Sequence, residues 1–106
     1  MHRDAKDKLV DFLERRAFDP VMRAKPGLRS ESDKSKLQKL QQSTRSEIER
    51  FRHYGSAREV LVNFKRDLTS SKARQIHRDL QALHLPTILD IREDFEKLAA
   101  LLGVDA

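Results

Sequence analysis

The amino-acid sequence predicts an all-α protein, a small antiparallel bundle of four to five helices. Apolar residues recur at spacings of three and four along most of the chain, which is the helical period. Glycine and proline occur only three times each in 106 residues, too few for a chain built of many tight hairpins. Helix-capping patterns recur between the apolar stretches. The length predicts one domain over residues 1–106.

The first helix is predicted over Arg3–Ala17. Asp19-Pro20 has the pattern of an N-cap followed by proline at the first helical position, so a separate short turn is expected over 21–24. Pro26-Gly27 breaks the chain, and residues 25–32 are predicted to be a mobile connector. The inward face of the first helix combines Leu9, Phe12, Leu13 and Ala17.

The longest helix is predicted over 31–54, capped by Ser30 and ended by Gly55 in the left-handed conformation. Its apolar stripe is narrow, and it is weakest between Leu40 and Ile48. A narrow stripe is also what a two-helix seam presents to a partner. The stripe consists of Leu37, Leu40, Thr44, Ile48 and Phe51.

The segment Ser56-Ala57-Arg58-Glu59 matches a capping box, in which Ser56 accepts from the Glu59 backbone and Glu59 reaches back to that of Ser56. The next stripe is Val60, Leu61, Phe64 and Leu68. Thr69-Ser70-Ser71 then competes with the helix for backbone hydrogen bonds and favours a break. No glycine or proline enforces this break, so residues 56–83 form either one helix or two.

A further stripe, Ala73, Ile76, Leu80 and Leu83, is ended by Leu85-Pro86. Thr87 is predicted to cap the last helix, with Asp90 three residues later, and Gly103 to stop it. The inward face of this helix holds Ile88, Ile91, Phe95, Leu98 and Leu102. Four aromatic residues, Phe12, Phe51, Phe64 and Phe95, are the expected centre of the core.

Composition excludes several classes of function. The chain has no cysteine, and therefore no disulfide, no cysteine-based zinc site and no thiol nucleophile. No apolar run is long enough to span a bilayer, and the charged start of the chain is not followed by an apolar signal core. We therefore expect a soluble cytoplasmic protein of bacterial type, without a membrane partner.

Charge is unevenly distributed along the chain. The formal net charge is +5, yet residues 86–106 hold two basic and five acidic side chains. One explanation is that an acidic helix packs beside basic ones and complements them. The other is that a basic face with an acidic flank orients a charged partner.

Catalytic and metal-binding patterns are absent from the sequence. There is no phosphate-binding glycine loop and no nucleophile elbow, and the serines occupy caps or solvated helix positions. Glu49 and His53 are one helical turn apart, but no second pair completes a four-ligand metal sphere. The sequence therefore predicts no catalytic residue, cofactor or metal, and it favours a non-enzymatic protein.

The strongest nucleic-acid feature is the basic segment 69–78, which follows a helix after a short break. It resembles the second helix of a helix-turn-helix motif, although its turn lacks the usual glycine. The competing explanation is an ordinary amphipathic helix with a basic outer face. Its candidate phosphate- and base-contacting residues are Ser70, Ser71, Lys72, Arg74, Gln75 and Arg78.

Association with a protein is the function that the sequence favours. Arg52, His53 and Tyr54 form an amphipathic cluster of the kind found at interfaces, although Tyr54 would also serve to cover the end of the bundle. We expect a small interaction or regulatory module that acts through an unidentified protein partner or as a homodimer. Nucleic-acid binding through residues 69–78 and the basic part of the helix before them is the alternative.

Three short motifs resemble those of small bacterial proteins of uncharacterised function. They are Phe18-Asp19-Pro20-Val21, Tyr54-Gly55-Ser56-Ala57 and Leu85-Pro86-Thr87-Ile88. Because these motifs are caps and turns, the resemblance implies a helical fold and transfers no active-site residue and no partner.

Overall fold

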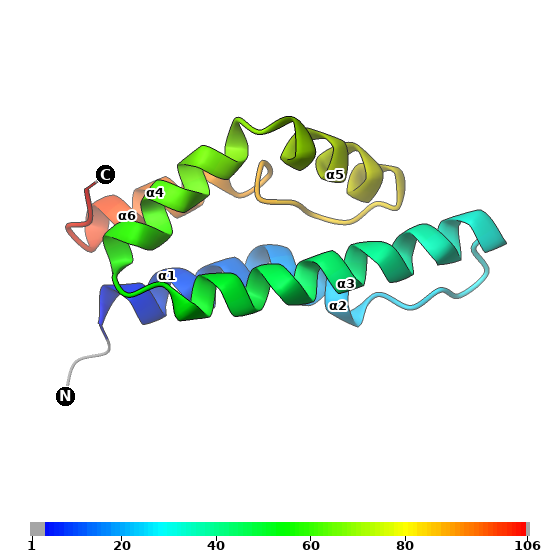
Figure 1. Cartoon of the computed structure of the whole chain (residues 1–106), viewed down its shortest axis with the longest axis horizontal. Helices are drawn as coiled ribbons and strands as arrows, with labels where there is room; N and C mark the ends of the chain where they lie inside the picture. Colours follow the sequence, from blue (N-terminus) through cyan, green and yellow to red (C-terminus); the bar gives the residue numbers. More distant parts are fainter. Residues whose placement is uncertain (1–3, 106) are drawn as a thin grey trace.

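The computed structural model describes residues 4–105, which form helices and turns without a β-strand (Figure 1). There are five helical rods, which confirms the predicted all-α bundle. The first rod joins α1 (Ala5–Leu13), the π-helical segment η1 (Glu14–Phe18) and α2 (Asp19–Arg23). The others are α3 (Glu31–His53), α4 (Ala57–Leu68), α5 (Ser71–Ala82) and α6 (Arg92–Leu101).

The rods form two layers. The first rod and α3 run antiparallel beside each other, and α4, α5 and α6 cover one side of this pair (Figure 1). Helices α4 and α6 contact α1, whereas α5 contacts α3. The molecule is elongated, with extents of 46 × 29 × 20 Å, because α5 lies beyond the end of α4 instead of folding back onto it.

The predicted break at Asp19-Pro20 is wrong, because the first rod continues through it. The backbone N–H of Asp19 donates to the carbonyl of Glu14, five residues back, so the helix widens by one residue just before the proline. Proline has no N–H and its ring clashes with the carbonyl four residues back in a regular α-helix. The π-turn changes the register at this point, and the rod continues to Arg23. The predicted start at Arg3 lies outside the described residues.

Helix α3 begins as predicted, and it ends differently. The Ser30 hydroxyl accepts from the backbone N–H of Asp33 at 3.2 Å, so the last two residues of the predicted connector 25–32 are helical. Gly55 does not adopt the left-handed conformation, which among the described glycines is found only at Gly27 and Gly103. Instead, Tyr54 is extended and turns the chain directly into the cap of α4.

The capping box at the start of α4 is half confirmed. The Ser56 hydroxyl accepts from the Glu59 backbone N–H at 3.2 Å. The Glu59 carboxylate accepts from the N–H of Gly55 at 2.8 Å, one residue earlier than predicted. The carboxylate thereby holds the tight connection between α3 and α4 as well as the helix start.

Residues 56–83 form two helices. The Thr69 hydroxyl donates to the carbonyl of Arg66 at 2.8 Å, and the Ser70 hydroxyl donates to that of Asp67 at 3.1 Å. Side-chain hydroxyls therefore occupy carbonyls at the end of α4, and this is the competition that the sequence predicted. Ser70 also caps α5, accepting from the N–H of Ala73 at 3.0 Å.

The last helix starts later than predicted. Thr87 does not cap it, because the Thr87 hydroxyl shares a hydrogen bond with His77 and accepts from the N–H of Leu89 at 3.1 Å. Asp90 accepts from the N–H of Thr87 at 2.9 Å, which closes a turn before α6 begins at Arg92. Gly103, at a φ of 72°, follows the end of α6 as predicted.

The core is divided into two hydrophobic clusters. The larger cluster lies among α1, η1, α3, α4 and α6 and contains Phe51, Phe64 and Phe95, as predicted. Phe12 is only half-buried, and Phe18, which the sequence analysis left out of the core, is buried. The smaller cluster joins α2, α3 and the end of α5 through Val21, Leu37, Leu40, Leu80 and Leu83.

Candidate functional site

The basic segment singled out in the sequence corresponds to helix α5. The inner face of α5 is anchored by Leu80, with Ile76 partly buried beside it, against Val21 and the start of α3. The outer face is open to solvent and carries most of the predicted contact residues. These residues are Ser71, Arg74, Gln75 and Arg78, whereas Lys72 is also exposed but lies on the flank of α5 that faces α3.

Ser70 differs from the other predicted contact residues. It is half-buried, and its hydroxyl both accepts from Ala73 and donates to the carbonyl of Asp67. These bonds build the turn between α4 and α5. Ser70 therefore has a structural part in this site, and the neighbouring Ser71 is the serine that solvent reaches.

Two of the exposed side chains are linked along the helix. Arg78 donates to the amide oxygen of Gln75 at 2.7 Å, and Gln75 donates to the carboxylate of Asp79 at 3.0 Å. Within residues 4–105, no carboxylate lies within 4 Å of the cationic groups of Lys72, Arg74 or Arg78. The positive charges on α5 therefore remain available to an anion, while Gln75 is held by its own helix.

Two further cations belong to the helix before this segment, whose basic part the nucleic-acid hypothesis included. Lys65 and Arg66 are exposed in the last turn of α4, directly before the turn into α5. Basic residues in the last turn of a helix complement its dipole, which is how such residues are ordinarily explained. Both precede segment 69–78 closely in the sequence.

Arg50 fixes the position of the α4–α5 turn relative to α3. Its guanidinium donates to the carboxylates of Glu47 and Asp67 and, at 2.7 Å, to the hydroxyl of Tyr54. It also lies over the ring of Phe51, 4.8 Å from the centroid. Burial lowers the pKa of Arg50, but the hydrogen bonds that it donates to Asp67 and Glu47, together with their negative charges, outweigh burial and raise the pKa above its ordinary value, so Arg50 stays charged.

The predicted interface cluster at the end of α3 is bound to its own chain. Arg52 forms a two-point ion pair with Glu14, at 2.9 and 2.6 Å, and this hydrogen bonding raises the pKa of Arg52. Tyr54 is half-buried and packs edge-on against Phe51. His53 is exposed, with Nδ1 2.6 Å from the carbonyl of Glu49. The structure does not bring the three side chains together in one open patch.

No metal-binding cluster of three histidine or acidic side chains is found in the described residues. The Glu49–His53 pair is joined through the Glu49 backbone carbonyl, so the two side chains do not converge. His77 is hydrogen-bonded to Thr87, which joins α5 to the segment before α6. These two histidines therefore have structural partners.

The acidic last helix is paired in part with the basic first rod. Arg16 of η1 donates to Asp94 of α6 at 3.0 Å, and both side chains are about half exposed. This contact supports the explanation in which an acidic helix complements a basic neighbour. No acidic residue of α6 is paired with the cations of α5.

Hydropathy and comparison with known proteins add two findings. None of the helices formed by residues 4–105 is long and apolar enough to cross a membrane. No protein-family model, curated protein or solved structure matches the chain.

Proposed function

We propose that the protein binds nucleic acid through the outer face of α5, with duplex DNA as the first substrate to test. The observation that supports this most directly is a set of three exposed cations on α5 that have no carboxylate within 4 Å among residues 4–105. Arg74 and Arg78 lie on the outer face, and Lys72 lies on the flank toward α3. Cations that are free of carboxylates bind phosphates and release condensed counterions.

The proposed contact is with the phosphate backbone more than with the base edges. Arg78 and Gln75, the side chains with the geometry to read bases, are hydrogen-bonded to each other. Ser71 on α5 and Lys65 and Arg66 in the last turn of α4 are also exposed and provide further groups for phosphate oxygens. We therefore expect weak sequence preference and strong dependence on salt.

A protein partner or a homodimer was the first expectation from the sequence, and the structure supplies less support for it. The apolar stripe of α3 packs in the core of the same chain, since Leu37, Leu40 and Phe51 are all buried. The large apolar side chains that are exposed within residues 4–105 lie on separate elements: Leu28, Val62 and Leu101. Scattered apolar residues of this kind are ordinary on a monomer surface.

The test is a fluorescence-anisotropy titration of labelled duplex DNA, with single-stranded RNA in parallel, at low and then physiological salt. The variant carries Lys72→Ala, Arg74→Ala and Arg78→Ala together. A matched control carries Lys8→Ala, Arg58→Ala and Lys97→Ala, which removes the same charge from exposed positions on α1, α4 and α6.

We expect wild-type protein and the control to bind DNA with similar affinity. The affinity of the α5 variant should be lower by a factor of about ten or more. Equal losses in the two variants would mean that net charge, and not α5, attracts the DNA. Preference for the single-stranded RNA would move the proposal to that substrate. Absence of binding at low salt would reject it, and light scattering would then test the homodimer.

A further inference from the structure

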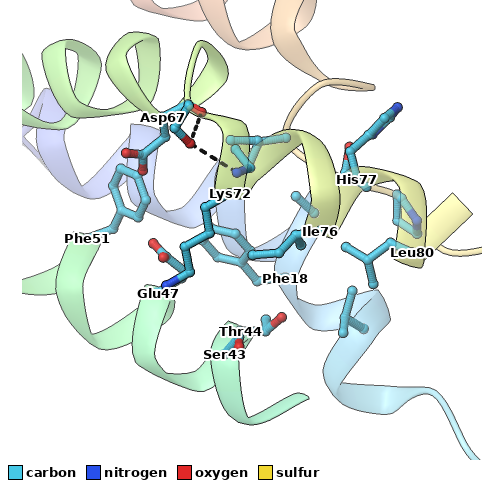
Figure 2. Close-up of a pocket in the computed structure, with 17 residues that line it drawn as sticks. Phe18, Ser43, Thr44, Glu47, Phe51, Asp67, Lys72, Ile76, His77 and Leu80 are labelled. Atoms are coloured by element: carbon cyan, nitrogen blue, oxygen red, sulfur yellow. Dashed lines mark hydrogen bonds between the residues drawn. The ribbon is translucent and has the colours of Figure 1, made fainter. Parts of the chain in front are cut away.

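A cavity of about 130 Å³ lies under α5, between this helix, α3 and the junction of η1 with α2 (Figure 2). It occupies the boundary between the two hydrophobic clusters. Phe18 and Phe51 belong to the larger cluster and Val21 and Leu80 to the smaller, and all four line it. Protein interiors are ordinarily close-packed, so a cavity at this position suggests a site for a bound molecule.

We propose that this cavity binds a small uncharged organic molecule with a compact apolar body, such as an aromatic ring, and one hydroxyl group. The size sets the upper limit. A cavity of about 150 Å³ with apolar walls binds benzene, so the space here holds a ligand on the order of one ring with a short substituent. The walls are mainly aromatic and aliphatic, as small-molecule sites are.

The polar groups of the cavity favour a hydroxyl on the ligand. The two buried polar side chains among the described residues, Thr44 and Thr87, both line it. The hydroxyl of Thr87 is already engaged by His77 and by the N–H of Leu89. Thr44 projects from α3 into the space that Ile76 and Leu80 enter from α5 (Figure 2). We therefore assign the orienting hydrogen bond to Thr44.

The charges at the rim disfavour an ionic ligand. Glu47 and Asp67 line the cavity, and both carboxylates are hydrogen-bonded to Arg50. The side chain of Lys72 reaches across from α5 toward Glu47, adding a positive charge to the same rim (Figure 2). With two acidic and two basic side chains gathered there, an ion would lose its hydration without meeting a net opposite charge.

The proposal is tested with four probes of similar size: benzyl alcohol, toluene, benzoate and benzylamine. Each is titrated into the isotope-labelled full chain, and amide NMR shifts and the melting temperature are followed. We expect saturable shifts among the lining residues with benzyl alcohol, weaker binding of toluene, and the weakest binding of the two ions. Stabilisation should rise with ligand concentration as mass action requires.

Two variants locate the site. Ala73→Leu fills the cavity from its wall and should abolish binding, whereas Ala100→Leu adds the same side chain at an exposed position of α6 and should leave binding unchanged. Thr44→Val keeps the shape of the side chain and removes its hydroxyl. This substitution should lower the affinity for benzyl alcohol about threefold to tenfold, because one hydrogen bond is lost. The affinity for toluene should be unchanged.

Several results would overturn the inference. Absence of saturable shifts with any probe would show that the cavity has no such ligand, and tighter binding of benzoate or benzylamine would reject the uncharged class. Binding that survives Ala73→Leu would place the site elsewhere. Should Ala73→Leu fail to fold, the contrast between benzyl alcohol and toluene in Thr44→Val decides. The outcome is separate from DNA binding, since both variants keep every cation of α5.

Discussion

The guanidinium of Arg50 on α3 is hydrogen-bonded to the carboxylate of Asp67 on α4, three residues before the serine that caps α5. The backbone carbonyl of the same aspartate accepts from the N–H and the hydroxyl of Ser70, at 3.2 and 3.1 Å. One residue therefore ties the turn to α3 through its side chain and shapes the turn through its backbone. This arrangement fixes where α5 begins.

Asp67→Asn is expected to lower the free energy of unfolding by about 1 kcal/mol, because a partly exposed charge-assisted hydrogen bond is lost while the packing is kept. Urea denaturation measures the change. Glu96→Gln serves as the control, since Glu96 is exposed on α6 and should shift stability by less than about 0.5 kcal/mol. Equal effects of the two substitutions would contradict the structural part assigned to the Arg50–Asp67 pair.

The adjacent serines at the start of α5 should behave differently. Ser70→Ala removes the cap of α5 and is expected to cost about 1 kcal/mol of stability. Ser71→Ala changes an exposed position in the first turn and should be neutral within about 0.5 kcal/mol. Thermal and urea denaturation of the two variants decide the point, and a larger loss for Ser71→Ala would show that the helix starts one residue later.

Phe64 contributes much of the packing in the larger hydrophobic cluster. It is fully buried and stacks on Phe95 with ring centroids 4.0 Å apart. Phe64→Ala is therefore expected to cost about 3–5 kcal/mol. Phe12 is half-buried, with Arg16 over its ring, so Phe12→Ala should cost less than half as much. Chemical denaturation compares the free energies of unfolding of the two variants. A loss below about 1 kcal/mol for Phe64→Ala would mean that α4 packs against the core through another face.

The periodic apolar positions were predictable because one helical face is buried whatever its partner. Phe51, Phe64 and Phe95 followed from spacing alone, and the hydroxyl competition at residues 69–71 has the local cause that the sequence suggested. Pro20 was predictable as a disturbance of the helix. The local sequence does not decide between a π-turn and a break, because both accommodate a residue without a backbone N–H. Packing of the whole rod selects between them.

Relationships across long sequence separations were not predictable. The hydroxyl of Thr87 has the sequence context of an N-cap, yet it is engaged by His77, ten residues earlier. The charged residues of α5 were identified from the sequence. That none of its cations forms an ion pair within the described part of the chain depends on where Asp67 and the acidic residues of α6 lie. The cavity draws its lining from residues 17–88, so no single stretch of sequence contains its signal.

The central claim is that the cations of α5 contact the phosphates of nucleic acid, and the salt dependence of DNA affinity tests it most directly. For wild-type protein and for the variant lacking the side chains of Lys72, Arg74 and Arg78, the logarithm of the association constant is plotted against that of the salt concentration. Three lost phosphate contacts should make the slope less steep by about 2.7. Identical slopes for the two proteins, or equal affinity at every salt concentration, would contradict the claim.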